Sequence, residues 1–178
     1  MPSIKIKVPL SYFRYARRKA IRQTWAKDQA ILPAHVIFLL GKTYNEIPPM
    51  NHSLEEEITT FNDILQAGFQ DTYANLTLKS MFMLKYGTEL ESSQHQYVMK
   101  VDDDSYINVN RLLTYAEIFG KRCQQNCILG HVLGPNSPVI RSKHHDRHYT
   151  KGWEVPWYIY NQTTFPNAVS GSGYMISR

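Results

Sequence analysis

Three consecutive aspartates, Asp102–Asp104, directly follow the predicted strand Tyr97–Val101. Carboxylates this close repel one another, so a folded chain keeps them at a strand end only if a cation or several hydrogen-bond donors offset the charge. In an extended segment alternate side chains point the same way, which predicts that Asp102 and Asp104 share one ligand while Asp103 faces the opposite side. Carboxylate oxygens suit manganese or magnesium, and these ions keep positions for water and for phosphate oxygens. The cluster therefore predicts a divalent-cation site that accepts a phosphorylated ligand.

Other interpretations of the aspartates compete with this one. They can form a solvated acidic turn that caps a helix starting near Asn108. An EF-hand calcium loop counted from Asp102 fails, because it requires Gly and Glu where the chain has Ile107 and Leu113. A phosphatase of the haloacid dehalogenase kind also places paired aspartates after a buried strand, but it expects Thr or Val where Tyr106 stands. The acidic turn and the phosphatase stay open as alternatives.

Basic residues gather near the N-terminus in a helix-like pattern after a candidate cap at Ser11. They are Arg14, Arg17, Arg18, Lys19 and Arg22, interleaved with Phe13, Ala16, Ile21 and Trp25. This helix face either lies in solvent or faces phosphate. The net charge of +5 suits an anionic diphosphate as well as nucleic acid. Because only this segment favours nucleic acid, we predict no nucleic-acid partner.

Glycines and aromatic residues mark the C-terminal part of the chain. Two glycines separated by one residue permit a tight turn or a close approach of a ligand to the backbone. We therefore interpret Ser170, Gly171, Ser172 and Gly173 as a candidate substrate loop. The aromatic residues before it either stack on sugar rings or belong to the core; they are Trp153, Trp157, Tyr158 and Tyr160.

Alternating helices and buried strands are expected to position these residues. The predicted strands are His35–Leu40, closed by Gly41, then Tyr97–Val101 and Cys127–Gly130. The predicted helices are Leu54–Leu65, Asn75–Leu90 and Asn108–Phe119, with a proline-bearing loop from Tyr44 to Asn51. This pattern predicts an α/β sandwich with a largely parallel sheet, whose ligands bind at the carboxyl ends of the strands. With 178 residues and 43% hydrophobic content, we expect a single domain covering residues 1–178.

The chain also carries features that bear on its compartment. Cys123 and Cys127 are too few for a structural zinc site, and they either pair locally or stay free. Acceptor patterns for N-glycosylation occur at Asn51, Asn75 and Asn161, which favours the secretory pathway. No stretch approaches the roughly 20 apolar residues of a membrane-spanning helix, and the first residues lack the apolar centre of a signal peptide.

Several blocks of residues occur in a fixed order around the aspartates. They are Arg17–Trp25, Phe38–Gly41, Asp63–Leu65, Asp71–Ser80, Tyr97–Asp104 and Ser170–Tyr174. From about Arg17 to Ser177, this series resembles glycosyltransferase family 31, the β-1,3-galactosyltransferases and β-1,3-N-acetylglucosaminyltransferases. The resemblance implies a GT-A type, Rossmann-like sandwich with a mostly parallel central sheet, truncated at its C-terminus.

The resemblance also implies an activity and a location. We expect a hexosyltransferase that moves galactose or N-acetylglucosamine from a UDP-sugar, with inversion, to a hydroxyl of an acceptor glycan on protein or lipid. Its expected cofactor is Mn²⁺ or Mg²⁺. The resemblance implies a type II membrane protein on the lumenal side of the Golgi, with an anchor before Met1. A non-catalytic relative that binds nucleotide sugar or carbohydrate stays open as the alternative.

Roles for individual residues follow from the same resemblance. Asp104 is expected to be the direct metal ligand together with Asp102, while Asp102 and Asp103 contact the nucleotide sugar. Arg22 and Lys79 are expected on the donor side, where a cation meets the diphosphate. The alternative for both is a structural ion pair.

The chain departs from the family pattern at several positions. Tyr86 and the polar run Glu91–His95 stand where relatives carry Trp and then Cys, so a disulfide common in relatives is missing or rearranged onto Cys123 or Cys127. Family members place an acidic motif, whose aspartate is the expected general base, downstream of the glycines. Because this sequence ends at Arg178, we expect the base to lie beyond it. We therefore expect the chain alone to bind UDP and manganese weakly and to turn over little substrate.

Overall fold

The computed structural model describes residues 2–28, 31–43, 53–86, 96–123, 126–134, 136–141 and 154–177. The chain divides into two compact units. The larger unit comprises Met1–Leu129 with Gly171–Arg178, and the smaller comprises Gly130–Ser170. The single domain predicted from the sequence stays a prediction.

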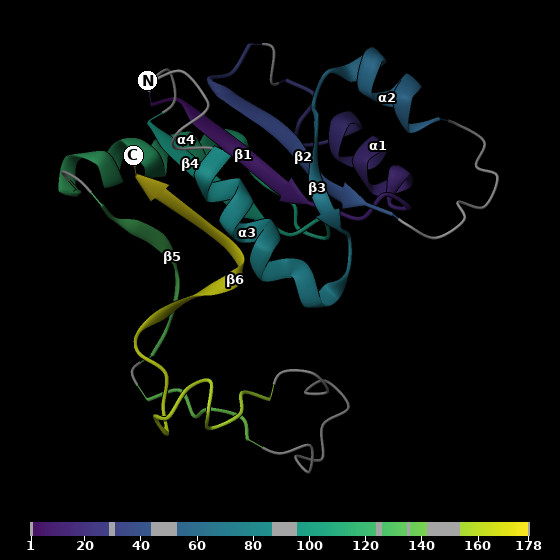
Figure 1. Ribbon diagram of the computed structural model, residues 1–178. Coiled ribbons are helices and arrows are strands. Elements are labelled where there is room, and N and C mark those ends of the chain that lie inside the picture. The colour runs from purple at the N-terminus through teal and green to yellow at the C-terminus, as the bar shows by residue number, and fades with distance from the viewer. Residues whose placement is uncertain are drawn as a thin grey trace. The chain divides into compact units, whose positions relative to one another are not determined.

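The chain forms a mixed sheet that confirms the predicted α/β fold (Figure 1). The strands are β1 (Ile4–Pro9), β2 (Ala34–Lys42), β3 (Ile64–Gln70), β4 (Tyr97–Val101), β5 (Ile128–Leu133) and β6 (Ala168–Ser177). Their order in the sheet is β3-β2-β1-β4-β6-β5. The pairs β1–β2, β1–β4 and β2–β3 are parallel, and β6 runs antiparallel to β4. A mostly parallel sheet of this kind is consistent with a GT-A type fold.

Helices cover both faces of this sheet. They are α1 (Tyr15–Gln23), α2 (Leu54–Phe61), α3 (Leu76–Lys85), preceded by the 3₁₀ turn Tyr73–Asn75, and α4 (Val109–Arg122). The main core packs one sheet face against α1, α2 and α4, with Ile21, Leu54, Leu113 and Ala116 facing the strand residues Ile4, Ile6 and Val8. A smaller core on the opposite face joins Met83 of α3 to Leu39 and Ala67. In Figure 1, α3 crosses one face of the sheet while α4 lies behind it.

The elements that flank the aspartates were predicted correctly. The strand Tyr97–Val101 is confirmed, and every residue of it is buried. Asn108 caps α4 as expected, because its side chain accepts a hydrogen bond of 3.0 Å from the Arg111 N–H. The helix then continues beyond the predicted end at Phe119 to Arg122.

The prediction of one helix from Leu54 to Leu65 was wrong. Helix α2 starts with a capping box formed by Ser53 and Glu56, but it ends at Phe61. Asn62 has a φ of 48°, in the left-handed region that ends helices. Residues from Ile64 onward then pair with β2 as strand β3. Leu65 falls at a helical spacing from Leu54 only by coincidence.

Other boundaries also differ from the prediction. Arg14, not Ser11, is the N-cap of α1, and the Ser11 hydroxyl instead accepts from the Phe13 N–H at 3.3 Å. Gly41 lies within β2 rather than closing it. Strands β1 and β6 were not predicted. The loop expected from Tyr44 to Asn51 and the last residues of the helix expected to reach Leu90 lie outside the described residues.

The smaller unit is organised around Arg141. Its guanidinium donates to the backbone carbonyls of Val155, Tyr160 and Gln162. The same group lies 3.9 Å from the ring centroid of Trp157, within cation–π range. One arginine therefore ties the aromatic segment to the rest of this unit.

Cys123 and Cys127 form a disulfide, so the two thiols pair locally. The bond links the C-terminal end of α4 to the residue before β5. No helix in the described ranges combines the length and the apolar character needed to cross a bilayer.

Candidate active site at the carboxyl end of β4

The three aspartates lie where β4 ends, beside the carboxyl end of its parallel neighbour β1. The Asp102 N–H donates to the Ser172 carbonyl at 3.0 Å, which extends the β4–β6 ladder one step beyond the pair Val101 and Gly173. The backbone of the first aspartate is therefore held by the sheet itself. This is the edge at which ligands bind in parallel α/β sheets.

Lys100 holds the side chain of Asp102. Its ammonium group, on a side chain only 11% exposed, donates to the Asp102 carboxylate and to the Gly171 carbonyl. The Asp102 charge also acts on Tyr174. Burial, together with this negative charge, raises the pKa of the Tyr174 phenol above its ordinary value. The Asp102 side chain is thus tied to both β4 and β6.

Asp103 and Asp104 share a different cation. The Arg17 Nη1 atom lies 2.9 Å from Asp103 Oδ1 and 3.9 Å from Asp104 Oδ2. The expected alternation of the three side chains was wrong, because the chain turns at Asp103 and Asp104, where the Ser105 N–H donates to the Asp102 carbonyl at 3.2 Å. The alternation rule applies only to extended backbone. The turn brings Asp103 and Asp104, not Asp102 and Asp104, to one partner.

The carboxylates at this edge suit a cation that takes most of its ligands from water and from a bound phosphate. In the described part of the chain, no three His, Cys, Asp or Glu side chains surround one point. Magnesium and similar ions bind through one or two carboxylates and complete their shell with phosphate oxygens and water. The Asp104 side chain is 71% exposed and Asp102 is 41% exposed. Both fit that mode of binding, and their assignment as ligands stays a prediction.

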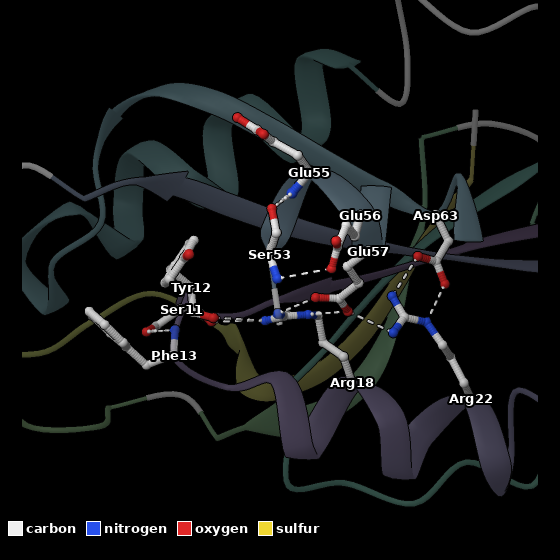
Figure 2. Close-up of polar contacts among 10 residues, drawn as sticks. All are labelled: Ser11, Tyr12, Phe13, Arg18, Arg22, Ser53, Glu55, Glu56, Glu57 and Asp63. Atoms are coloured by element: carbon white, nitrogen blue, oxygen red, sulfur yellow. Dashed lines mark hydrogen bonds and ion pairs between the residues drawn. The ribbon is translucent and has the colours of Figure 1, made fainter. Parts of the chain in front are cut away.

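Arg22 of helix α1 lies in a buried network of ion pairs (Figure 2). It donates to both carboxylate oxygens of Asp63 at 2.8 and 2.7 Å and to Glu57 at 2.7 Å. Burial opposes the charge on Arg22, but the bonds from Asp63 and Glu57 outweigh it and raise the pKa of Arg22. Its guanidinium is therefore already occupied by two carboxylates, and its donor-binding role stays a prediction.

Arg18 extends the same network to the segment after β1. It donates to Glu57 at 2.8 and 2.6 Å, and its Nη1 reaches the carbonyls of Ser11 and Tyr12, each at 3.2 Å. Figure 2 shows Glu57 between the two arginines, with Arg18 pointing on toward Ser11 and Tyr12. Burial alone would raise the pKa of Glu57, but hydrogen bonds from Arg18 and Arg22 hold it below its ordinary value. The hydrogen bonds of the network therefore favour the charged forms of Glu57 and Arg22.

Lys79 supports the same segment from helix α3. Its ammonium group donates to the Leu10 carbonyl at 2.8 Å and to Asp71 at 2.6 Å, and the side chain is 4% exposed. Asp71 in turn accepts from the Gly41 N–H at 2.9 Å. Together with Arg18, Lys79 holds three successive carbonyls, from Leu10 to Tyr12. Its predicted contact with the donor is not tested by this geometry.

The segment interpreted as a substrate loop is not a loop. Ser170, Gly171, Ser172 and Gly173 belong to strand β6, and Gly173 pairs with Val101 of β4. A Cβ atom at Gly171 would meet nothing within 4 Å, and one at Gly173 would make only ordinary contacts. Packing among the described residues therefore does not require either glycine. Their contact with a substrate stays a prediction.

The aromatic residues expected near sugar rings divide into two groups. Trp157 and Tyr158 are exposed, while Tyr160 stacks on Phe165 with ring centroids 5.5 Å apart. Trp153 lies outside the described residues.

The glycosylation candidates differ in exposure. Asn51 lies outside the described residues. The candidates Asn75 and Asn161 are described, and Asn161 is the more exposed of the two.

A comparison with known families identifies the family to which this chain belongs. A family model described as Galactosyltransferase matches residues 16–178, which include the aspartates. The chain belongs to the galactosyltransferase family. This confirms the predicted family and leaves the phosphatase alternative without support.

Individual members of this family align with nearly all of the chain. It is 29% identical over 181 residues to β-1,3-galactosyltransferase 1 of Homo sapiens, which covers 99% of this chain and 52% of the relative. The same values hold for the Mus musculus protein of that name. It is 31% identical to lactosylceramide 1,3-N-acetyl-β-D-glucosaminyltransferase B of Danio rerio, over 92% of this chain and 43% of the relative. The chain thus spans about half the length of these galactosyltransferase-family proteins.

Two cationic residues of this family member were missed as part of the site. Lys100 lies two residues before Asp102, and that spacing in a strand places both side chains on one face. This signal was available in the sequence. Arg17 was recognised only as one of several basic residues. Its contact with Asp103 joins α1 to the end of β4, and sequence spacing does not predict such a contact.

Proposed function

We propose that the protein is a hexosyltransferase that uses a UDP-sugar as donor. It transfers galactose or N-acetylglucosamine with inversion to a hydroxyl of an acceptor glycan on protein or lipid. The observation that carries this proposal is the aspartate cluster at the carboxyl end of β4, with Asp104 exposed, in a chain of the galactosyltransferase family. The named activities of the relatives support the same class of reaction.

The proposed reaction needs two kinds of chemical help. A base takes the proton of the acceptor hydroxyl, and a cation stabilises the negative charge that grows on the leaving diphosphate. A bound Mn²⁺ or Mg²⁺ ion supplies the second of these. Asp104 and Asp102 are the carboxylates that would hold it, while Asp103 contacts the nucleotide sugar. For the base, we propose an acidic residue in the part of the relatives' length that this chain does not span.

The surrounding residues prepare this edge for a ligand. Lys100 fixes the Asp102 carboxylate against β6, and the backbone after β1 is held by Arg18 and Lys79. Groups that are held before a ligand arrives lose little freedom when it binds. We therefore assign Lys100, Arg18 and Lys79 positioning roles.

We also propose a location on the lumenal side of the Golgi membrane. The disulfide between Cys123 and Cys127 supports it, because disulfides persist in oxidising compartments. The glycosylation patterns at Asn75 and Asn161 support the same pathway.

Calorimetric titration with a panel of sugar nucleotides tests the proposed donor. The panel contains UDP-galactose, UDP-N-acetylglucosamine and ADP-glucose, each in manganese buffer. We expect heat from at least one UDP-sugar and none from ADP-glucose. Failure of both UDP-sugars to bind would contradict the proposed function.

A further inference from the structure

Arg17 differs from the basic residues of the buried ion pairs in how many of its hydrogen-bond donors have partners. The side chains of Arg18, Arg22 and Lys79 are 1%, 9% and 4% exposed, and each is held by at least one carboxylate and a further acceptor. The Arg17 side chain is 38% exposed. It therefore combines a position at the site with access to solvent.

The contacts of Arg17 leave most of its hydrogen-bonding capacity unused. A guanidinium carries five N–H donors. Within the described part of the chain, only Nη1 of Arg17 has partners, at 2.9 Å from Asp103 and 3.9 Å from Asp104. The other two nitrogens remain available for an anion.

A divalent cation at Asp104 would change the balance at Arg17. The ion would then neutralise the Asp104 carboxylate, and the guanidinium would face a like charge at short range. The Arg17 side chain is long and partly exposed, so it is able to move to another partner. The preferred partner of a planar guanidinium is a carboxylate or a phosphate that it contacts through two parallel hydrogen bonds.

We propose that Arg17 is a donor-binding residue that has two alternative partners. In the cation-free protein it neutralises Asp103 and Asp104. Once a cation occupies Asp104, Arg17 transfers to the diphosphate of the donor. This inference rests on the proposed function. It predicts that replacing Arg17 weakens the binding of UDP but does not weaken the binding of Mn²⁺.

The variant Arg17→Gln tests the proposal in two titrations. Free Mn²⁺ is followed by electron paramagnetic resonance as protein is added without nucleotide, and UDP binding is measured by calorimetry at saturating Mn²⁺. We expect Arg17→Gln to bind Mn²⁺ at least as tightly as the parent, because a competing cation has been removed. We expect its affinity for UDP to fall about 10-fold, as for a lost hydrogen bond between charged groups.

Three controls make the result specific. Lys19→Gln removes one positive charge from an exposed position of the same helix and should leave both titrations unchanged. Arg17→Lys keeps the charge without the planar fork and should restore part of the UDP affinity. Uridine, which lacks the phosphates, should bind the parent and Arg17→Gln equally.

Two results would overturn the proposal. Unchanged UDP affinity in Arg17→Gln would show that Arg17 does not reach the diphosphate. Weaker Mn²⁺ binding in that variant would show that Arg17 only orients the carboxylates. A parent protein that shows no Mn²⁺-dependent UDP binding would instead contradict the proposed function, so the two failures are distinguishable.

Discussion

Replacing Glu57 by glutamine measures how strongly the buried ion pairs stabilise this fold. Glu57 is 3% exposed and accepts two hydrogen bonds from Arg18 and one from Arg22. Glutamine has nearly the same shape as glutamate. The substitution therefore removes the negative charge without creating a cavity. Arg22 keeps Asp63, but Arg18 loses its one carboxylate partner among the described residues.

The expected destabilisation follows from this difference. Removing one member of a buried ion pair costs about 3–5 kcal/mol, because the other charge stays buried without compensation. Since Arg18 retains the carbonyls of Ser11 and Tyr12, we expect Glu57→Gln to lower the free energy of unfolding by about 3 kcal/mol, the lower end of that range. Domains of this kind are stable by only about 5–15 kcal/mol in total, so the change is large.

The effect should depend on pH in a defined direction. The folded-state pKa of Glu57 lies below its ordinary value of 4.5. Its ion pairs therefore contribute fully above pH 4.5, and the contribution is lost as the pH falls through the folded-state pKa. Because Glu57→Gln lacks this titrating group, the difference in stability between parent and variant should narrow below pH 4.5.

Urea unfolding followed by circular dichroism at pH 7 and at pH 4 measures both effects. Glu55→Gln, at an exposed position of the same helix, is the matched control and should remain close to the parent. A loss of less than about 1 kcal/mol for Glu57→Gln, the value typical of surface pairs, would refute the reasoning.

Two further predictions concern other parts of the chain. Gly41→Ala should lower the melting temperature, because the new Cβ would lie 2.9 Å from the Asp71 Cβ. The control Gly68→Ala should keep the melting temperature of the parent, since a Cβ there would have nothing within 4 Å. Equal melting temperatures for the two variants would contradict this prediction. When the protein passes through a secretory host, mass spectrometry should find glycan at Asn161 and not at Asn75, because Asn161 is exposed while the Asn75 amide already donates to a backbone carbonyl at 2.9 Å. Glycan at Asn75 alone would show that this local bond does not protect it.

The fold was predictable where the signals are local. The sequence correctly predicts the strand Tyr97–Val101 and the cap at Asn108, because both depend only on neighbouring residues. Strand β6 was missed because its glycines suggest a turn, whereas pairing with β4 keeps the segment extended. Strand β3 was missed because Leu65 continues a helical spacing that Asn62 interrupts.

The site was predictable in its position but not in its contacts. Placing the aspartates at the carboxyl end of a strand requires only the strand and a general rule for parallel sheets. The partners of the aspartates and arginines depend on how helices pack. Arg17 is 86 residues from Asp103, and Arg18 is 39 from Glu57. Sequence spacing carries no information about such pairs, so Arg22 was assigned to the donor side without its carboxylate partners in view.

The most direct test of the central claim is Mn²⁺-dependent binding of UDP to Asp104→Asn. Calorimetry compares the parent, this variant and the exposed control Glu55→Gln, each with and without Mn²⁺. We expect the parent and the control to bind UDP more tightly with Mn²⁺, and Asp104→Asn to lose that enhancement while its fold is retained. Equal Mn²⁺-dependent binding by Asp104→Asn and the parent would contradict the assignment of the aspartate cluster as the cation site.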